Sequence, residues 1–247
     1  MKRVLTKGVT SKRRGRKALE RIATAVILLT VLSLTLVTGV TYTHNEETQN
    51  AGNFAIYKGD PKDKKAALMF NVYENAENVM EILRILRKYS AKATFFIGGI
   101  WAEKNTETLL ELSLNGQELG CHGYLHKDHS KMTIEQNKEE IVICSRLVEN
   151  VTGQPVTLFA PPSGAYGKNT EIACRELGMK MILWSKDTID WRDSDVSLLV
   201  RRATKNMTPG DMILMHPKDQ TVLALPQIIQ AYQNAGYELV TVGELLK

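Results

Sequence analysis

The sequence predicts an α/β protein whose main part is a deformed barrel of seven or eight β/α units, preceded by one transmembrane helix. From Lys65 onward, short apolar strands alternate with amphipathic helices over about 185 residues. Such alternation implies a parallel sheet covered by helices, and the number of repeats favours a barrel over an open sheet. Because a regular eightfold barrel usually needs about 250 residues, a shortened and deformed barrel fits this length better.

The N-terminus predicts a membrane anchor. Residues 1–21 hold nine Lys or Arg and one acid, and residues 22–40 then run for 19 residues without a charge. As a helix the uncharged stretch is roughly 28 Å long, close to the hydrocarbon thickness of a bilayer. By the positive-inside rule we expect a single-pass signal-anchor over residues 22–42 in the cell membrane, with the N-terminus inside and the domain outside. A cleaved signal peptide is the alternative, although its apolar region is usually shorter.

Four parts are therefore expected: a basic cytoplasmic tail at 1–21, the anchor at 22–42, a polar linker at 43–64 and a domain at 65–247. The whole chain has a formal charge of +5, but the tail alone carries +8 and the rest sums to −3. The domain is thus not basic, and no nucleic acid partner is predicted. Three cysteines without a C-x-x-C spacing predict no disulfide framework.

The first elements show the alternation most clearly. Residues 66–71 (AALMFN) and 93–97 (ATFFI) are apolar runs of strand length, and a Gly-Gly pair closes the second. Between them, residues 77–89 place apolar side chains at helical spacings of three and four. Residues 106–114 form the next predicted helix, which an Asn-Gly pair stops, and residues 118–121 form the third strand.

The middle of the chain continues the pattern. A capping box beginning at Thr133 starts a helix that runs to about Glu149. Residues 156–160 are a predicted strand that ends in Pro-Pro-Ser-Gly, and residues 170–177 are a helix that a glycine stops. Residues 180–184 (KMILW) are the fifth strand.

The last elements repeat the same order. Residues 196–204 are a predicted helix, followed by a Thr-Pro-Gly turn and by the strand 212–215 (MILM). A helix at 225–234, a strand at 237–241 and a short helix at 242–246 complete the chain.

His122 and His126 are candidate metal ligands because they follow the strand 118–121 in an H-x-x-x-H spacing. One helical turn brings positions i and i+4 onto one face, and paired imidazoles bind divalent metals such as zinc. Cys121 would point to the opposite face of the strand. Asp128 and His129 lie close by, but their loop has the composition of a solvated segment, which argues against a third ligand there.

His216 follows the strand 212–215, so it lies on the rim where the chemistry of a parallel barrel collects. It is a candidate general acid or base, or else a structural histidine at a strand end. Asp187 and Asp190 precede it and are candidates to orient it by hydrogen bonding, unless they are solvated loop acids. Tyr166, Trp184 and Trp191 lie on predicted rim loops, where an aromatic ring can stack on a sugar or simply cover the barrel mouth.

Six segments resemble, in the right order, the motifs of the polysaccharide deacetylase family, the NodB homology or carbohydrate esterase 4-like domain. The resemblance covers roughly residues 65–247. The first three segments are residues 66–70, residues 93–97 and the H-x-x-x-H stretch 118–126. Residues 159–166 are similar to the motif R-P-P-x-G, and residues 184–191 are similar to D-x-x-D-W. Residues 213–216 and 224–226 are similar to L-L-H and A-L-P. It implies a deformed (β/α) barrel of the polysaccharide deacetylase type that removes acetyl groups from sugars with the help of a divalent metal.

The chain lacks the charged residues that this family carries at three positions of its motifs. The first motif, T-F-D-D-G, supplies a base and a metal-binding Asp, but this chain has Asn71 and Val72. The Arg that orients the base is replaced by Ala160. An Arg without its carboxylate would be an unpaired buried charge, so loss of both is the expected relaxation of an inactive site. Residues 70–77 also resemble, in spacing, a sporulation-type first motif, F-D-x-x-W-G-N-E, again without the Asp.

The resemblance therefore predicts His216, Asn71 at the position of the lost base and Asp187 as catalytic positions, and His122 with His126 as metal ligands. Pro162, Tyr166 and Trp191 are the predicted substrate-binding residues. A zinc, cobalt or manganese ion would bind weakly or not at all.

We expect a membrane-anchored, extracytoplasmic deacetylase-like protein that acts on or binds N-acetylated cell-wall glycan with impaired catalysis. One alternative is an active metal-dependent deacetylase that uses a relocated carboxylate, Glu74 or Glu77. The other is a non-catalytic interaction module in wall or spore assembly.

Overall fold

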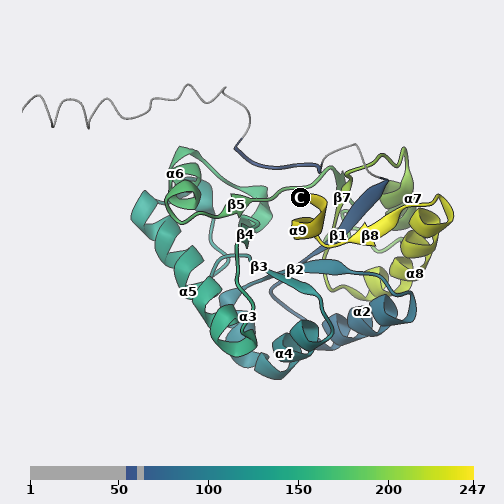
Figure 1. The fold of residues 1–247 in the computed structure, drawn as a ribbon, viewed down its shortest axis with the longest axis horizontal. Coiled ribbons are helices and arrows are strands. Elements are labelled where there is room, and N and C mark those ends of the chain that lie inside the picture. Colours follow the sequence, from purple (N-terminus) through teal and green to yellow (C-terminus); the bar gives the residue numbers. More distant parts are fainter. Residues whose placement is uncertain (1–53, 60–63) are drawn as a thin grey trace, which may run out of the picture. The chain divides into compact units, whose positions relative to one another are not determined.

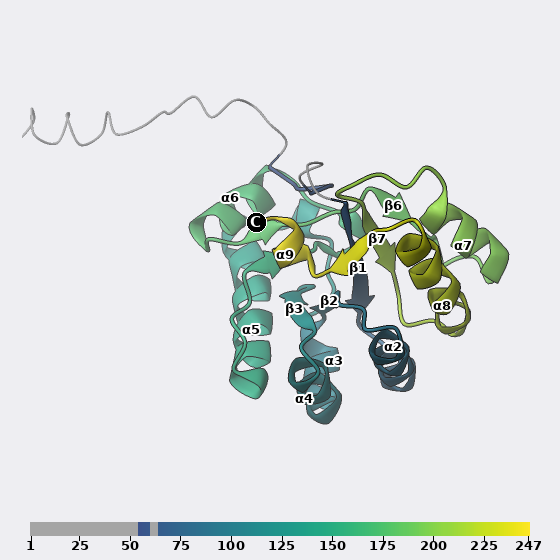
Figure 2. The same ribbon diagram turned by 45° about the vertical axis from the view of Figure 1, so that its right-hand side comes forward.

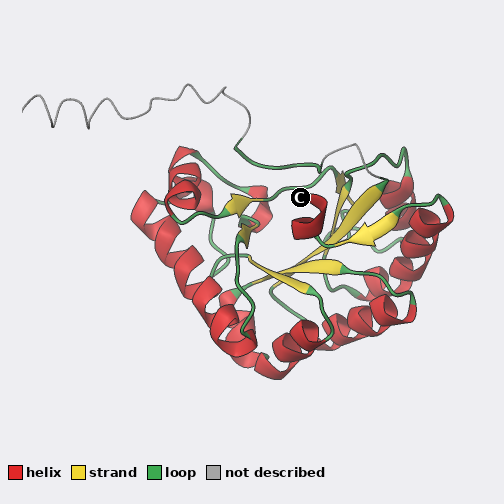
Figure 3. Ribbon diagram, in the orientation of Figure 1, coloured by secondary structure: helices red, strands yellow, loops and turns green. Residues whose placement is uncertain are grey.

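A computed structural model describes residues 54–59 and 64–247, and it shows one curled parallel sheet with helices along its outer side (Figures 1 and 3). The strands are β1 (Lys65–Val72), β2 (Ala93–Ile97), β3 (Glu118–Cys121), β4 (Leu158–Phe159), β5 (Lys180–Met181), β6 (Lys186–Asp187), β7 (Met212–Met215) and β8 (Glu238–Val240). Their order is β5-β4-β3-β2-β1-β7-β6, and β8 pairs with β1. The expected α/β architecture is thus confirmed as a curled half-barrel of parallel strands.

The helices follow the strands along the chain, as in repeated β/α units. They are α2 (Ala76–Lys88), α3 (Gly99–Lys104), α4 (Thr106–Leu114), α5 (Ile134–Thr152), α6 (Lys168–Glu176), α7 (Val196–Thr204), α8 (Asp219–Asn234) and α9 (Val242–Leu245). Helices α2, α4 and α5 lie along the outer face of the sheet (Figure 2). Glu77 lies in the first turn of α2, where a negative charge is favourable to the helix dipole.

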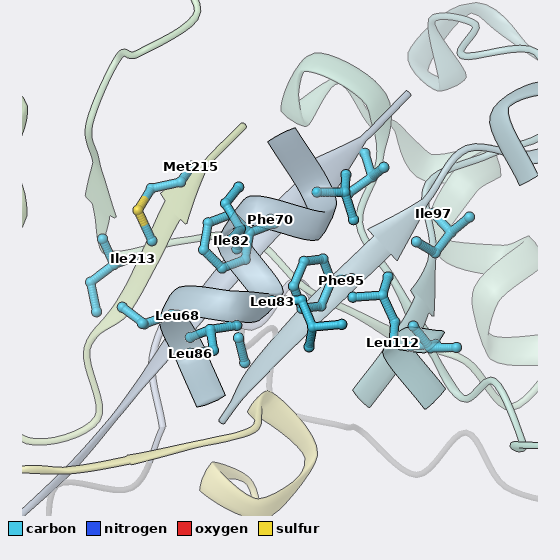
Figure 4. Close-up of a cluster of buried hydrophobic side chains, with 14 of the residues drawn as sticks. Leu68, Phe70, Ile82, Leu83, Leu86, Phe95, Ile97, Leu112, Ile213 and Met215 are labelled. Carbon is cyan, nitrogen blue, oxygen red and sulfur yellow. The ribbon is translucent and has the colours of Figure 1, made fainter. Parts of the chain in front are cut away.

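Successive residues of each strand face opposite sides of the sheet, and this alternation divides the core in two. On β1, Leu68 and Phe70 pack toward the helices together with Phe95 of β2 (Figure 4). Ala67 and Met69, on the other face, belong to a second buried cluster inside the curl of the sheet. Both faces of β1 are therefore buried, which explains its nearly continuous apolar sequence.

The C-terminal helix α9 lies against one end of this interior. Its residues Val242 and Leu245 are buried within the inner cluster. Val242 N donates a hydrogen bond of 2.8 Å to Thr94 Oγ1 near the start of β2. Glu118, at the start of β3, accepts a hydrogen bond of 2.8 Å from Gly243 N. Since α9 covers the amino ends of these strands, their carboxyl ends are left for the functional site.

The sheet does not close by strand pairing, because its two ends, β5 and β6, do not pair with each other. Strands β4 and β5 have two residues each, where the sequence predicts five. Two prolines follow β4 after a single residue, Ala160, and offer no amide hydrogen to a ladder. Ile56 lies beside the end of β5, donating to Met181 O and accepting from Leu183 N at 2.8 Å each. A segment inside the predicted linker thus packs against the domain.

Other element boundaries also differ from the expected ones. The Gly-Gly pair after β2 ends the strand as predicted, but its second glycine starts helix α3, which the sequence pattern did not indicate. Strand β6 was also not expected, because two polar residues carry no hydrophobic signal. Helix α8 begins at Asp219 rather than at 225 and includes Pro226. Cys121, Cys144 and Cys174 are free and buried.

Within the described part of the chain, no helix is both long and apolar enough to cross a membrane. The predicted anchor at 22–42 and the basic tail at 1–21 lie outside the described residues.

The inner cluster predicts that two methionines of this domain contribute very differently to the free energy of unfolding. Met69 is fully buried on β1, whereas Met80 is 37% exposed on α2. We expect Met69→Ala to lower the free energy of unfolding by about 2–5 kcal/mol, because it leaves a cavity, and Met80→Ala to change it by less than about 0.5 kcal/mol. Urea unfolding followed by circular dichroism measures both. Equal effects of the two substitutions on the free energy of unfolding would contradict the placement of Met69 in the interior of the curled sheet.

Candidate functional site

The site consists of the residues that continue the inward-facing rows of four strands past their carboxyl ends. On β1, Met69 faces inward and Asn71 is the next inward position. By the same period of two, His216 follows Leu214 of β7, and Ala160 follows Leu158 of β4. His122 comes directly after Cys121, whose side chain packs in the outer core, so His122 also faces inward. The sheet therefore brings these four positions together.

His122 is buried and fixed in orientation by the backbone of the neighbouring strand. Its Nδ1 lies 2.7 Å from the carbonyl oxygen of Ala160. Since a carbonyl only accepts, Nδ1 carries the hydrogen and Nε2 presents a lone pair. Burial, together with the neighbouring His126, lowers the pKa of His122 to about 3, so the ring is neutral over the physiological range. Second-shell bonds of this kind orient histidines that bind metals.

His126 approaches His122 through a loop and not through the helical turn that the spacing predicts. The chain between them is irregular, and the φ angles of Gly123 (76°) and His126 (54°) are left-handed. The two imidazole centroids lie 5.1 Å apart. The ring of Tyr73 lies 4.3 Å from that of His126 and 6.1 Å from that of His216. Tyr73 thus stands among the histidines of the site.

His216 is held by Asp190, a fully buried carboxylate. The Nδ1 of His216 lies 2.7 Å from Asp190 Oδ1, and the amide of His216 donates to Oδ2 at 2.7 Å. The Thr221 hydroxyl donates to the same oxygen at 2.6 Å. Asp190, not Asp187, therefore orients the imidazole. The remaining ring nitrogen, Nε2, is the atom available to exchange a proton or hydrogen-bond a ligand.

These residues line a pocket of about 360 Å³. Its lining consists of Asn71, Tyr73, His122, His126, Ser163, Trp184, Asp187, Trp191, Leu214 and His216. Of the predicted site residues, Asn71, Asp187, the three histidines and Trp191 are thus brought together. Trp191 is 54% exposed, which suits a ring at the mouth of a pocket.

The other two predicted substrate-binding residues are not among the residues that line the pocket. Pro162 is buried in a short 3-10 helix, and its ring lies near Gly123. The hydroxyl of Tyr166 lies 3.1 Å from that of Tyr57. Their roles in substrate binding stay predictions.

Three lining residues, Tyr73, Ser163 and Leu214, were missed by the sequence reasoning. Tyr73 lies two positions after Asn71, so continuing the strand alternation one step beyond β1 would have indicated it. Ser163 lies within the Pro-Pro-Ser-Gly turn with a φ of 56°, and no sequence signal pointed its backbone into the pocket.

His129 differs from its expectation. Its loop was predicted to be solvated, but the side chain is fully buried, and its Nδ1 lies 2.7 Å from Asn137 Oδ1. The reason is helix α5, whose first turn carries Asn137 beneath this loop. His129 is not among the residues that line the pocket, and Asp128 instead caps the short 3-10 helix that starts at His129.

The donor set of the site does not fit a catalytic divalent metal. Such a site usually offers three protein ligands, and only His122 and His126 are present as a pair. The side chain of Val72 is fully buried in the outer core, and a hydrocarbon cannot coordinate an ion. Among the described residues, no group of three or more His, Cys, Asp or Glu is arranged to hold a metal.

Neither of the two carboxylates suggested as a substitute adds a third metal ligand to His122 and His126. Glu74 forms an ion pair with Lys218, a residue at the start of α8. Glu77 is exposed on the first turn of α2.

Comparisons with known proteins agree on one family. Residues 58–182 match the family described as polysaccharide deacetylase. The uncharacterized protein YlxY of Bacillus subtilis is 37% identical, over 77% of this chain and 60% of its own length. The peptidoglycan-N-acetylglucosamine deacetylase of Bacillus cereus is 31% identical, over 75% of this chain and 89% of its own length. The chain thus spans less than two thirds of YlxY but most of the B. cereus enzyme.

Solved structures place the fold beside an inactive relative. Wild-type BA3943, a CE4 family pseudoenzyme from Bacillus anthracis, has a TM-score of 0.76 at 33% identity, over 78% of this chain and 69% of that chain. A BA3943 mutant with restored enzymatic activity has the same TM-score at 32% identity, over 78% of this chain and 71% of that one.

Burial of His122 predicts a loss of stability in acid. Its pKa of about 3 in the fold lies below the ordinary 6.5, so the unfolded chain binds more protons between these values. The free energy of unfolding should therefore fall as the pH drops below 6.5, with a His122 contribution of about 3 kcal/mol at pH 4. Urea unfolding in chelator-containing buffer at several pH values measures it. If the free energy of unfolding of His122→Asn fell in acid as steeply as that of the unmodified protein, His122 would not be the source of the acid sensitivity.

Proposed function

Since the chain belongs to the polysaccharide deacetylase family, we propose that it binds N-acetylated cell-wall glycan and hydrolyses it poorly or not at all. The proposal depends above all on Asn71. This residue occupies the innermost polar position of β1, is 2% exposed, and its Oδ1 has no hydrogen-bond partner among the described residues. A neutral amide cannot take a proton from water, so the position of the general base carries no base.

Two further replacements support the loss of hydrolysis. Val72 stands where the family's first motif carries its metal-binding carboxylate, and its side chain is directed into the outer core. Ala160 stands where the motif carries Arg, and only its backbone carbonyl contributes to the site, through His122. The parts that remain are a pair of neutral imidazoles and the Asp190–His216 pair, which can orient and hydrogen-bond a ligand.

The pocket is also suited to sugar. Trp184, Trp191 and Tyr73 contribute aromatic rings, which pack against the apolar faces of pyranose rings. Asn71 and His216 contribute hydrogen-bonding groups beside them. Several relatives are named for deacetylation of peptidoglycan, at N-acetylglucosamine in the B. cereus enzyme and at N-acetylmuramic acid in PdaC of B. subtilis. A cell-wall glycan is therefore the substrate class that we propose for this chain.

We further propose that residues 22–42 anchor the protein in the cell membrane as a single span, with the domain outside. The basic residues before the apolar stretch and its length of about 20 residues support this topology. A place in spore or wall assembly, as an interaction module without glycan binding, is the alternative for a protein in this location.

An active enzyme with a relocated carboxylate is less well supported. Glu74 would have to leave Lys218 to reach the histidines, and Glu77 would have to leave the exposed face of its helix. A carboxylate already paired with a lysine gains little from a second cation.

We expect the full-length protein to release acetate from N-acetylglucosamine oligomers at least about 100-fold more slowly than the B. cereus deacetylase, because general base catalysis alone contributes about 10²–10⁴-fold. The assay contains zinc, cobalt or manganese in separate series. Robust turnover that disappears in His126→Ala would show that the site is an active metalloenzyme and would overturn the proposal.

The same oligomers test binding without chemistry. We expect the Asp190–His216 pair and the aromatic rings to retain glycan affinity, measurable by calorimetry, and Trp191→Ala to weaken it about tenfold. Leu223→Ala, which truncates a 64% exposed side chain on α8 outside the pocket lining, is the control. Absence of any glycan binding would favour the interaction module instead.

A further inference from the structure

The pocket has an uneven distribution of charge. Asp187 is the one carboxylate among the lining residues, and no lysine or arginine is among them. Ile189 N donates to Asp187 Oδ1 at 2.7 Å, and among the described residues no other hydrogen bond or ion pair reaches this carboxylate. Burial raises the pKa of Asp187, as it does for a carboxylate without a close counter-charge.

The cations nearest to the pocket are already engaged by other acids. Arg202 binds Asp193 Oδ2 at 2.6 Å, and Arg192 binds the same carboxylate at 3.0 Å. Lys218 is paired with Glu74. Arg202 and His216 lower the pKa of Asp187 by their charge, but each of them is already paired with another aspartate.

The replaced motif residues make the site more negative than the family's metal-loaded site. Asn71 and Val72 remove two negative charges, whereas Ala160 removes one positive charge. The dication that the missing metal-binding carboxylate and the imidazoles would hold is also absent, which removes two more positive charges. The balance is a loss of one unit of positive charge, in a pocket that still contains Asp187. Such a pocket attracts a cationic ligand more than a neutral one.

The aromatic rings favour the same kind of ligand. Tyr73, Trp184 and Trp191 line the pocket together with the histidines. The face of a tyrosine or tryptophan ring attracts an ammonium group through its quadrupole and also packs against a sugar ring. Arg192 already shows this attraction, since its guanidinium carbon lies 5.8 Å from the Trp191 ring centroid. A ligand that joins a sugar ring to an ammonium group would use the carboxylate and the rings at once.

We propose that the pocket selects the N-deacetylated form of the glycan, in which the hexosamine carries a free ammonium group that pairs with Asp187. An acetamide would leave this carboxylate desolvated and unpaired, which is costly. The protein would then recognise the product of a deacetylation, and the reaction that supplies its ligand is an N-deacetylation of the wall polymer. This inference rests on the glycan binding proposed above and adds that, of the two forms of the glycan, the deacetylated one binds more tightly.

Calorimetry of the full-length protein with two tetramers tests this selection. One is β-1,4-linked glucosamine, and the other is the corresponding N-acetylglucosamine tetramer. We expect the amine form to bind at least about tenfold more tightly. Asp187→Asn should remove the preference, since a lost charge-assisted hydrogen bond weakens binding by about tenfold to a hundredfold. Glu77→Gln, which removes an equal charge from an exposed position on α2, should keep it.

Four outcomes would overturn the inference. Equal or tighter binding of the acetylated tetramer would leave only the proposed glycan binding, and binding of neither tetramer would overturn both. A preference that survives in a folded Asp187→Asn protein, checked by thermal melting, would remove the role of Asp187. Trp191→Ala offers a second variant at an exposed side chain, and it should weaken binding of the amine tetramer more than binding of spermine, because only the tetramer also packs a sugar ring against the indole. Spermine binding as tight as that of the amine tetramer would exclude recognition of a sugar.

Discussion

The strict alternation of side chains along parallel strands is the constraint from which the site follows. Because every second residue of β1, β3, β4 and β7 faces the inside of the curled sheet, the first inward positions beyond the packed core meet at one end. Those positions hold Asn71, His122, Ala160 and His216. The neighbouring outward positions, such as Val72, are buried among the helices. Small changes of residue type at this end therefore alter the chemistry without disturbing the core below it.

Much of the fold was predictable, because strands buried on both faces and amphipathic helices leave strong periodic signals. The long strand β1, the helix α5 with its capping box and the strand that precedes His216 are examples. The shortness of β4 and β5 and the pairing of Ile56 with β5 were not predictable. These features depend on how the ends of the sheet pack in three dimensions, which local sequence patterns do not indicate.

The candidate site was predictable in its strand-end residues and less so in its loops. His122, His216 and Asn71 follow directly from strands, so their meeting is a consequence of topology. Which of Asp187 and Asp190 bonds to His216 depends on the path of a loop, and local sequence does not reveal this path. The burial of His129 against α5 depends on a loop in the same way. Tyr73 lay one step beyond the end of β1, where the alternation still holds but the strand itself has ended.

The most direct measurement of the central claim is a gain of function in zinc-containing buffer. The triple variant Asn71→Asp, Val72→Asp, Ala160→Arg restores the carboxylates and the guanidinium that the family's motifs place at these positions. We predict that the variant binds zinc, with the new carboxylate at position 72 turned from the outer core toward the histidines at the end of β1. It should release acetate from N-acetylglucosamine oligomers at least about 100-fold faster than the unmodified protein, as the base contribution alone would require. A folded, zinc-loaded variant that hydrolyses no faster than the unmodified protein would contradict the claim that these three replacements impair the site.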